Sequence, residues 1–229
     1  MPQRITPTFK AVVLLSGGLD SAYNLGVAAH RFPSLLALTF DYGQRARGPE
    51  TKAARSIAAS FGATHKVVRL PWLGELAPAA ITDITVPLPT RPGCVRRLWV
   101  PNRNGVFVAV GAAYAEKYNA PLLITGFNAE EAADFPDNSI AFVRAANRGL
   151  RYSTGGRVRL VSFSTRMDKL TIIRKALALD VPLEKVYPCY TEGPRPCGRC
   201  VSCRRMAKSL RGAGFPDVAV KLFGTVANR

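Results

Sequence analysis

Short apolar runs alternate with stretches of helical composition along most of the chain. Five runs are typical of buried strands, and they span 11–15, 34–40, 65–70, 121–127 and 158–163. The stretches that separate or follow them predict helices over 21–31, 48–61, 103–118, 137–149 and 168–180. Gly62 suits the C-terminal cap of the second helix, and Asp168 suits the N-cap of the fifth. This alternation predicts an α/β fold, in which a doubly wound, mostly parallel five-stranded sheet carries helices on both faces.

Two parts of the chain do not follow this alternation. The segment 71–101 is rich in proline and has little periodicity. A loop of that length inside a compact domain is usually functional, so we expect it to act as a lid. The last part, 184–229, holds a group of cysteines and a helical stretch. We therefore expect an α/β domain over 1–183 with a small C-terminal segment over 184–229 packed on it.

The composition indicates a folded protein that does not enter a membrane. The chain has 229 residues, of which 48% are hydrophobic, so it can bury a sizeable core. The longest apolar run, 106–115, is too short for a membrane span. The first ten residues have no signal-peptide core, and we expect a cytoplasmic protein.

The net charge of +17 indicates anionic partners. Most of the 32 basic residues are arginines, which grip carboxylates and phosphates through two parallel bonds. This charge suits ATP, and it also suits nucleic acid. Because the arginines are scattered and form no basic block, we do not expect direct binding of nucleic acid.

The stretch Ser16-Gly17-Gly18-Leu19-Asp20-Ser21 directly follows the first predicted strand. Two glycines allow a sharp turn that leaves backbone amides uncovered, and the helix that follows adds the positive end of its dipole. The serine hydroxyls add donors, so the stretch predicts a cradle for an anion with several oxygens. It matches neither the Walker phosphate loop nor the Gly-x-Gly-x-x-Gly dinucleotide fingerprint. The alternative is a plain Gly-Ser turn after a core strand.

Polar residues also follow other predicted strands. They occur at 41–45, 128–131, 135–138 and 164–169. In a parallel sheet the carboxyl ends of the strands meet at one edge, where ligands bind. These loops therefore predict one site, although any single loop of this kind is more often a solvated turn.

Four of the five cysteines crowd near the C-terminus, at Cys189, Cys197, Cys200 and Cys203. Their spacers are short and rich in Gly and Pro, which lets four thiolates converge on a structural Zn²⁺ ion. Disulfides are disfavoured in a cytosolic protein, and a redox Cys-x-x-Cys pair is the remaining alternative. Cys94 stands alone, and we interpret it as a spare thiol. His30 and His65 are both interpreted as structural, so no histidine-based nucleophile is indicated.

Taken together, several motifs resemble those of one family. The first, SGG-x-DS, resembles the PP-loop of the N-type ATP pyrophosphatases. The others are 39–45 (TFDYGQR), 100–104 (VPNRN), 124–126 (ITG), 135–137 (FPD), 168–169 (DK), 189–190 (CY) and CG-x-C-x-x-C at 197–203. In this order they are similar to the QueC family, the 7-cyano-7-deazaguanine synthases of the queuosine and archaeosine pathways. The chain departs from the usual pattern in two places: Asn102 replaces a Gly, and the segment Phe135-Pro-Asp-Asn138 replaces Tyr-Pro-Asp-Cys.

The resemblance implies a fold of the adenine nucleotide alpha hydrolase type and a specific reaction. The carboxylate of 7-carboxy-7-deazaguanine would attack ATP, and ammonia would displace AMP to give an amide. A second ATP would activate the amide, which would then become the nitrile. The implied cofactors are ATP with Mg²⁺ and one structural Zn²⁺, and the implied assembly is a homodimer.

The resemblance also assigns site residues. ATP would be held by Leu15, Ser16, Gly17, Gly18, Leu19, Asp20 and Ser21, and by Thr39, Phe40 and Gly126 where such folds place adenosine. Asp20, Ser21, Lys169 and Arg103 would carry the chemistry. The base would be held by Gln44, Arg45, Asn104, Glu130, Phe135 and Asp137.

Three of these assignments keep alternatives. Lys169 would neutralise the departing pyrophosphate, or it is a surface lysine paired with Asp168. Arg103 is a clamp for a phosphate or a carboxylate, or an ordinary arginine at a helix start. The substrate carboxylate would face Arg45 or Arg144.

Two rival functions remain at this stage. One is another PP-loop enzyme, which thiolates or aminates a tRNA base or amidates a related deazapurine. The other is a zinc-ribbon protein that binds nucleic acid, as the charge of +17 allows. That second function leaves the SGG-x-DS cradle unexplained.

Overall fold

The computed structural model describes residues 8–224 and contains one five-stranded sheet. The strands are β1 (Ala11–Leu14), β2 (Leu35–Asp41), β3 (Thr64–Arg69), β4 (Leu122–Ile124) and β5 (Arg159–Val161). Their order is β3-β2-β1-β4-β5, and every neighbouring pair is parallel. The predicted fold class is therefore confirmed. The strand order reverses beside β1, and ligands of such sheets bind beyond the strand ends at that point.

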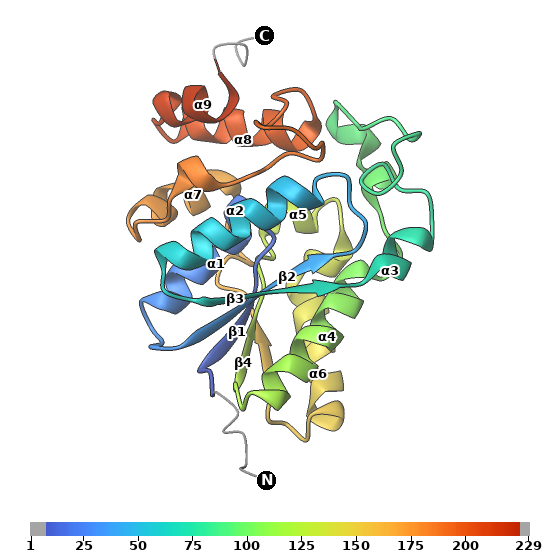
Figure 1. Cartoon of the computed structure of the whole chain (residues 1–229), viewed down its shortest axis with the longest axis vertical. Coiled ribbons are helices and arrows are strands. Elements are labelled where there is room, and N and C mark those ends of the chain that lie inside the picture. The colour runs from blue at the N-terminus through green and yellow to red at the C-terminus, as the bar shows by residue number, and fades with distance from the viewer. Residues whose placement is uncertain (1–7, 225–229) are drawn as a thin grey trace.

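Helices cover both faces of the sheet, as Figure 1 shows. One face carries α1 (Leu19–Ala29), α2 (Arg47–Ser60) and α7 (Lys169–Leu177). The opposite face carries α4 (Arg103–Lys117) and α6 (Ile140–Ser153). Successive residues of a strand point to opposite faces, so Val13 packs in the first core and Val12 in the second. Burial on both faces explains why the strands are continuous apolar runs.

Several predicted boundaries differ from the structure. Helix α6 begins at Ile140 rather than at 137, because the side chain of Ser139 accepts a hydrogen bond from the amide of Phe142. The residues before it form a separate 3-10 turn, η2 (Pro136–Asn138). Strand β4 stops at Ile124, and helix α7 stops at Leu177. Asp180 has φ of 53°, a left-handed conformation that does not continue a helix.

Two predicted caps are confirmed. The side chain of Asp168 accepts a hydrogen bond from the amide of Thr171 at 2.8 Å, at the start of α7. Gly62 follows the end of α2 with φ of 62°, a conformation for which glycine is suited because it lacks a Cβ atom.

The segment 71–101 is more ordered than its composition indicates. It contains the short helix α3 (Pro71–Glu75) and the 3-10 helix η1 (Pro92–Leu98), which includes the exposed Cys94. Its apolar residues Leu73, Ile81, Val95 and Leu98 form a third core cluster with Phe40 and Tyr42 at the end of β2. The segment is thus a packed wall beside the strand ends. Its action as a lid stays a prediction.

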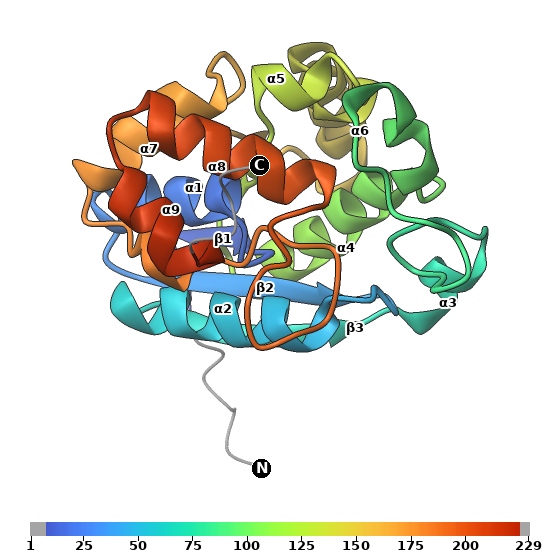
Figure 2. The same cartoon turned by 90° about the horizontal axis from the view of Figure 1, so that it is seen from above.

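The C-terminal segment lies over the carboxyl ends of the central strands, as the view from above in Figure 2 shows. It contains η3 (Leu183–Lys185), α8 (Val201–Gly212) and α9 (Pro216–Phe223). Met206, Leu210 and Phe223 share a core with α1 and α7, so this segment packs on the α/β layer. A short helix, α5 (Ala129–Ala132), lies between β4 and η2. No helix within residues 8–224 is long and apolar enough to cross a membrane.

Candidate active site

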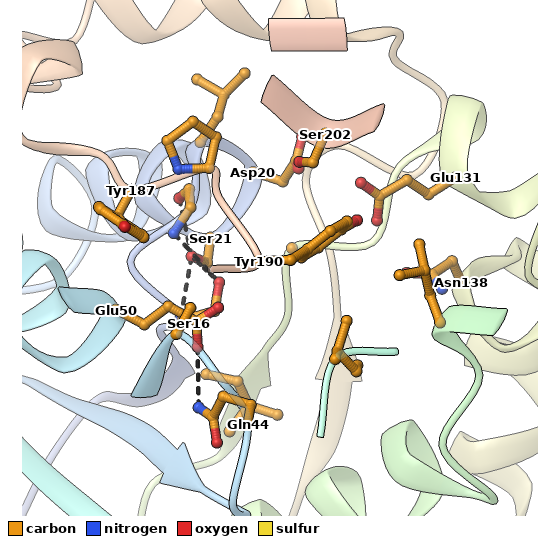
Figure 3. A pocket seen from close by; sticks show the side chains of 18 of the residues that line it. Ser16, Asp20, Ser21, Gln44, Glu50, Glu131, Asn138, Tyr187, Tyr190 and Ser202 are labelled. Atoms are coloured by element: carbon orange, nitrogen blue, oxygen red, sulfur yellow. Dashed lines mark hydrogen bonds between the residues drawn. The ribbon is translucent and has the colours of Figure 1, made fainter. Parts of the chain in front are cut away.

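A cavity of about 270 Å³ opens at the carboxyl ends of β1, β2 and β4. The turn after β1 and the start of α1 form its base, and the start of α4 and η2 form one side. Residues 187–190 and the first turns of α8 cover it (Figure 3). The cavity is therefore assembled from loops that lie far apart in the sequence, at the edge where the fold predicts a ligand.

The SGG-x-DS turn is held by its own two serines. The Ser16 amide donates to Ser21 Oγ at 3.2 Å, and the two hydroxyl oxygens lie 3.1 Å apart. Ser21 Oγ donates to the Gly18 carbonyl at 3.1 Å. Gly17 has φ of 85°, and a Cβ atom there would lie 2.5 Å from the Glu50 carbonyl oxygen. Only glycine fits this position, which explains the first glycine of the motif.

The turn leads into the N-terminus of α1, whose first amides have no partner within the helix. These amides and the helix dipole favour an anion at this end of the cavity. Gly126, beyond β4, lies against the same turn. A Cβ atom on Gly126 would lie 2.7 Å from the Ser21 amide nitrogen, so a side chain there would displace the turn.

Asp20 and Lys169 form an ion pair inside the cavity. Lys169 Nζ donates to Asp20 Oδ2 at 2.7 Å and to Glu131 Oε1 at 2.9 Å. Burial lowers the pKa of Lys169, but the two carboxylates outweigh it and raise the pKa well above its ordinary value. Lys169 is therefore a permanently charged, 6% exposed side chain. The alternative in which it is a surface lysine paired with Asp168 is wrong, because Asp168 caps α7 instead.

One oxygen of this group has no partner. Asp20 Oδ1 is buried, and it makes no hydrogen bond within the described residues, whereas Oδ2 binds Lys169. A buried carboxylate oxygen without a partner carries a desolvation cost of about 1–3 kcal/mol or more. An additional cation or donor at this oxygen would remove that cost.

A second group of charges ties α5 to α8. Arg205 Nε lies 3.2 Å from Glu130 Oε1, and its Nη2 lies 3.0 Å from Asp134 Oδ2. Glu130 Oε2 also accepts from the Lys169 amide at 3.2 Å. Arg205 lines the cavity, whereas Glu130 is not among the lining residues. The two carboxylates thus hold Arg205, and with it α8, over the site.

Arg103, at the start of α4, is a half-buried cation that also lines the cavity. Its Nη1 donates to the phenol oxygen of Tyr42 at 3.1 Å, and its Cζ lies 5.7 Å from the centre of that ring. Burial lowers the pKa of Arg103, but Tyr42 outweighs it, so the pKa stays above its ordinary value. No carboxylate of the described residues forms an ion pair with Arg103. Within residues 8–224 the printed hydrogen-bond partner of this half-buried guanidinium is a neutral phenol, so the group can accept an anion.

Glu50, in the first turn of α2, also lines the cavity. Gln44 Nε2 donates to Glu50 Oε2 at 2.9 Å and to the Phe40 carbonyl at 2.9 Å. Burial raises the pKa of Glu50 to about 7, against the opposing effects of Gln44 and Arg103. This carboxyl therefore exchanges a proton near neutral pH.

The four C-terminal cysteines meet at one point. Their sulfur atoms all lie within 4.8 Å of one another, and the sulfurs of Cys197 and Cys203 are 3.9 Å apart. A tetrahedral Zn²⁺ ion with Zn–S bonds of about 2.3 Å separates its sulfurs by about 3.8 Å, so the cluster fits this ion. The amides of Cys197 and Thr191 donate to Cys189 Sγ at 3.3 and 3.4 Å, which favours the thiolate form. The cluster can therefore bind a metal ion.

Comparison with known proteins identifies the family. A family model described as "Queuosine biosynthesis protein QueC" matches residues 10–214. The chain belongs to the QueC family. A 7-cyano-7-deazaguanine synthase of Pelotomaculum thermopropionicum is 42% identical over 217 residues, which cover 90% of this chain and 98% of that protein. Proteins of the same name from Methanosarcina barkeri and Bdellovibrio bacteriovorus are 38% and 42% identical, over 94% and 90% of this chain and 99% and 94% of theirs.

Most residues assigned from the QueC resemblance line the cavity. These are Leu15, Ser16, Gly18, Leu19, Asp20, Ser21, Phe40, Gln44, Arg103, Asn104, Gly126, Phe135 and Lys169. Five assigned residues lie outside the lining: Gly17, Thr39, Arg45, Glu130 and Asp137. Most residues assigned to ATP therefore lie together around the cavity. Of those assigned to the base, Gln44, Asn104 and Phe135 line the cavity, whereas Arg45, Glu130 and Asp137 do not.

The side chains of Thr39 and Arg45 form hydrogen bonds with other groups of the protein. The Thr39 hydroxyl donates to the Leu15 carbonyl at 2.6 Å, so the His65 Nε2 atom, 2.8 Å away, must donate to it. Arg45 donates to the carbonyls of Ala80 and Val86 and so fixes the segment 71–101. Arg144, the alternative partner for the substrate carboxylate, lies on α6 and is also outside the lining.

Several cavity residues were not assigned from the sequence. On α5 the carboxylate in the lining belongs to Glu131 rather than to Glu130. Tyr42, Glu50, Tyr187, Tyr190, Ser202 and Arg205 also line the cavity. Tyr42 belongs to the TFDYGQR motif and Glu50 follows shortly after it, so the motif was an available signal for both. Tyr187 and Tyr190 form an aromatic roof over the cavity. Their only signal in the sequence was their position on either side of Cys189.

The two departures from the usual QueC pattern have different consequences. Asn102 has φ of 50° and ψ of 25°, a left-handed conformation that asparagine adopts more readily than most residues other than glycine. It can therefore replace glycine at the start of α4 without changing the cavity. Asn138 is 7% exposed and lines the cavity, and its Nδ2 donates to Asp137 Oδ1 at 3.2 Å. This second departure thus changes the chemistry of the site.

Proposed function

We propose that the protein converts 7-carboxy-7-deazaguanine and ammonia into 7-cyano-7-deazaguanine, with two ATP molecules cleaved to AMP and pyrophosphate. The first ATP would activate the acid as an acyl adenylate, and the second would activate the amide. The membership in the QueC family and the names of the relatives support this assignment. The observation that supports it in the structure is a single cavity lined both by the turn at 16–21 and by Arg103, which forms no ion pair within residues 8–224.

The turn at 16–21 would hold the pyrophosphate-bearing end of ATP, through the free amides at the start of α1. Lys169 would neutralise charge on the departing pyrophosphate, since it is kept protonated by Asp20 and Glu131. Asp20 Oδ1, buried and without a partner, is the oxygen we assign to Mg²⁺. The ion would supply charge stabilisation on the phosphate oxygens.

Arg103 would bind the carboxylate of the base, or the phosphate to which that carboxylate becomes joined. Its present partner, the Tyr42 phenol, is neutral and can be exchanged for a charged ligand without leaving another ion unpaired. Holding the anion there would keep it in the same cavity as the nucleotide, and adenylation needs the two reactants to be held together.

The assignment of the base-binding residues stays a proposal. Asn104 and Phe135 line the cavity beside Arg103, and we assign them to the base. Asp137 would act through Asn138, whose amide it holds by a hydrogen bond. Gly126 and Phe40 would contact the adenosine, whereas Thr39 would support the turn after β1 through the Leu15 carbonyl.

We assign Zn²⁺ to the four-cysteine cluster, one ion for each chain. The sulfur positions fit a tetrahedral ion, and a site with four thiolates leaves no open position for water. The ion would join Cys189, which is next to the aromatic roof, to the start of α8. We also propose the division into 1–183 and 184–229, with the second part packed on the first.

The decisive test is product analysis by mass spectrometry. Pyrophosphate and AMP should appear only when ATP, the carboxy base and ammonium are all present for turnover, and the nitrile should accumulate. A sulfurated tRNA, or salt-sensitive binding of nucleic acid without ATP cleavage, would contradict the proposal. We expect a cytoplasmic homodimer, which sedimentation equilibrium and cell fractionation can test.

A further inference from the structure

Two ionisable side chains that line the cavity stand out because neither belongs to an ion pair within residues 8–224. One is Arg103, which the proposed function assigns to an anion. The other is Glu50, whose only hydrogen-bond donor in the structure is the neutral amide of Gln44. The charges of Asp20, Glu131, Lys169 and Arg205 in the same cavity are all paired. The Glu50 carboxyl thus has no cationic partner among the described residues and can bind a cation from a ligand.

A single turn after β2 fixes both groups. Tyr42 accepts from Arg103, and Gln44 donates to Glu50. The Tyr42 amide in turn donates to Gln44 Oε1 at 2.9 Å, and Gln44 is only 3% exposed. Because Gln44 uses its amide on three protein groups, it holds the Glu50 carboxyl in place rather than binding a ligand itself.

Glu50 also lies next to the PP-loop. Its carbonyl oxygen abuts Gly17, as the 2.5 Å approach to a Cβ atom there shows, and its side chain lines the same cavity as Ser16 (Figure 3). A ligand on this carboxyl would therefore lie beside the phosphate end of the cavity, where the activated carbonyl forms under the proposed function.

We propose that Glu50 binds the ammonium ion and delivers it as ammonia to the activated base. This inference rests on the proposed function. The reaction joins a carboxylate to a nitrogen that is a cation in water near neutral pH, and the cavity offers one unpaired cation and one unpaired carboxyl. Arg103 takes the anionic reactant, and Glu50 takes the cationic one.

The step balances as follows. Ammonium gives one proton to the Glu50 carboxylate, and the freed electron pair of nitrogen forms the new C–N bond with the acyl carbon. The C–O bond to AMP breaks, and its electron pair leaves with the AMP phosphate. That phosphate, whose second pKa is about 6, takes the second proton from nitrogen.

The surroundings of Glu50 suit a group that binds a cation and accepts a proton. Burial raises its pKa to about 7, within the range useful for general base catalysis at neutral pH. The charged and titratable groups that act on it are Arg103 from α4, Tyr42 from the β2 turn, and Tyr187 and Cys189 from the roof. Arg103 alone among them is a cation.

The test compares wild type with Glu50→Gln, which keeps the size of the side chain and removes its charge. ATP–pyrophosphate exchange with the carboxy base, measured without ammonium, should stay within about threefold of wild type. The KM for ammonium in amide formation should rise by about 10- to 100-fold, as expected for the loss of a hydrogen bond to a charged group. Hydroxylamine is neutral at pH 7.5 and should give hydroxamate at close to the wild-type rate.

Other outcomes overturn the inference. If Glu50→Gln loses exchange and needs more Mg²⁺, the carboxyl binds the metal–ATP complex instead. If the KM for ammonium is unchanged, or if hydroxylamine fails equally, Glu50 does not handle the nitrogen. Glu116→Gln, which removes a surface carboxylate paired with Arg157, is the matched control and should behave as wild type. Absence of exchange in wild type would contradict the proposed function itself.

Discussion

Lys169 lies 2.7 Å from Asp20, although 149 positions separate them in the sequence. The pair joins the start of α7 to the PP-loop, and Glu131 on α5 completes a group of three charges from three elements. The position of the turn at 16–21, which the proposed function assigns to phosphate, therefore depends on this lysine as well as on the glycines of the turn.

Replacement of Lys169 should impair both folding and turnover. Lys169→Met removes the cation and leaves two carboxylates without their partner, which costs about 3–5 kcal/mol when a buried pair is broken. Urea unfolding followed by circular dichroism measures this loss. A variant as stable as wild type would show that the pair is not a structural link. Lys175→Met, at the other end of α7, is the control.

The same substitution should change how stability depends on pH. Lys169 outweighs the effect of burial on Glu131 and lowers its pKa below the ordinary value of 4.5. In wild type this stabilisation is complete above that ordinary value and is lost as the pH falls through the lowered pKa. In Lys169→Met the lowering effect of the lysine is lost, so the pKa of both carboxylates rises relative to wild type. The variant should therefore gain stability relative to wild type as the pH falls from 7 to 5. Parallel melting curves across that range would contradict this reasoning.

The structure explains why the sequence predicted some parts of the site and not others. The strands, the PP-loop and the cysteine cluster depend on local patterns, and they were predicted from short stretches. Whether Glu130 or Glu131 faces the cavity depends on how α5 is oriented, and helix α5 has only four residues. The start of α6 was misplaced because Ser139 supplies the cap and residues 136–138 form a separate 3-10 turn. The aromatic roof at 187–190 depends on packing of the C-terminal segment, which no local pattern specifies.

Arg103 should matter through its charge rather than through its hydrogen bond to Tyr42. Arg103→Gln should lower kcat/KM for the carboxy base by about 10- to 100-fold, because a charge-assisted bond to the anion is lost. Tyr42→Phe removes only the neutral partner and should cost less than about tenfold. Steady-state kinetics with varied base distinguish the two. Equal losses in both variants would show that Tyr42 and Arg103 act as one structural unit.

Gly126 should not tolerate even a methyl group. A Cβ atom there would approach the Ser21 amide nitrogen to 2.7 Å, and this backbone cannot move without displacing the PP-loop. A shift of about 1 Å at a reactive site can cost about 10²-fold in rate, so Gly126→Ala should reduce ATP–pyrophosphate exchange to that extent.

Gly149 supplies the control for this steric argument. It lies in α6, and a Cβ atom there meets nothing within 4 Å. Gly149→Ala should keep full exchange activity and gain up to about 1 kcal/mol of stability, because alanine favours a helix over glycine. Full activity in Gly126→Ala would show that the turn is more adaptable than its contacts indicate.

Removal of one cysteine should separate the metal cluster from the other thiol of the chain. Cys200→Ser should lose bound Zn²⁺ and melt at a lower temperature, because the ion contributes to folding of the segment that covers the cavity. Cys94→Ser should keep one ion per chain and the wild-type melting temperature, since Cys94 is exposed and outside the cluster. Metal analysis and calorimetry measure both properties on the same sample. Retained zinc with unchanged melting in Cys200→Ser would refute a structural role for the metal. Loss of both zinc and thermal stability would support that role, and it would link the metal cluster to the cavity wall through Cys189.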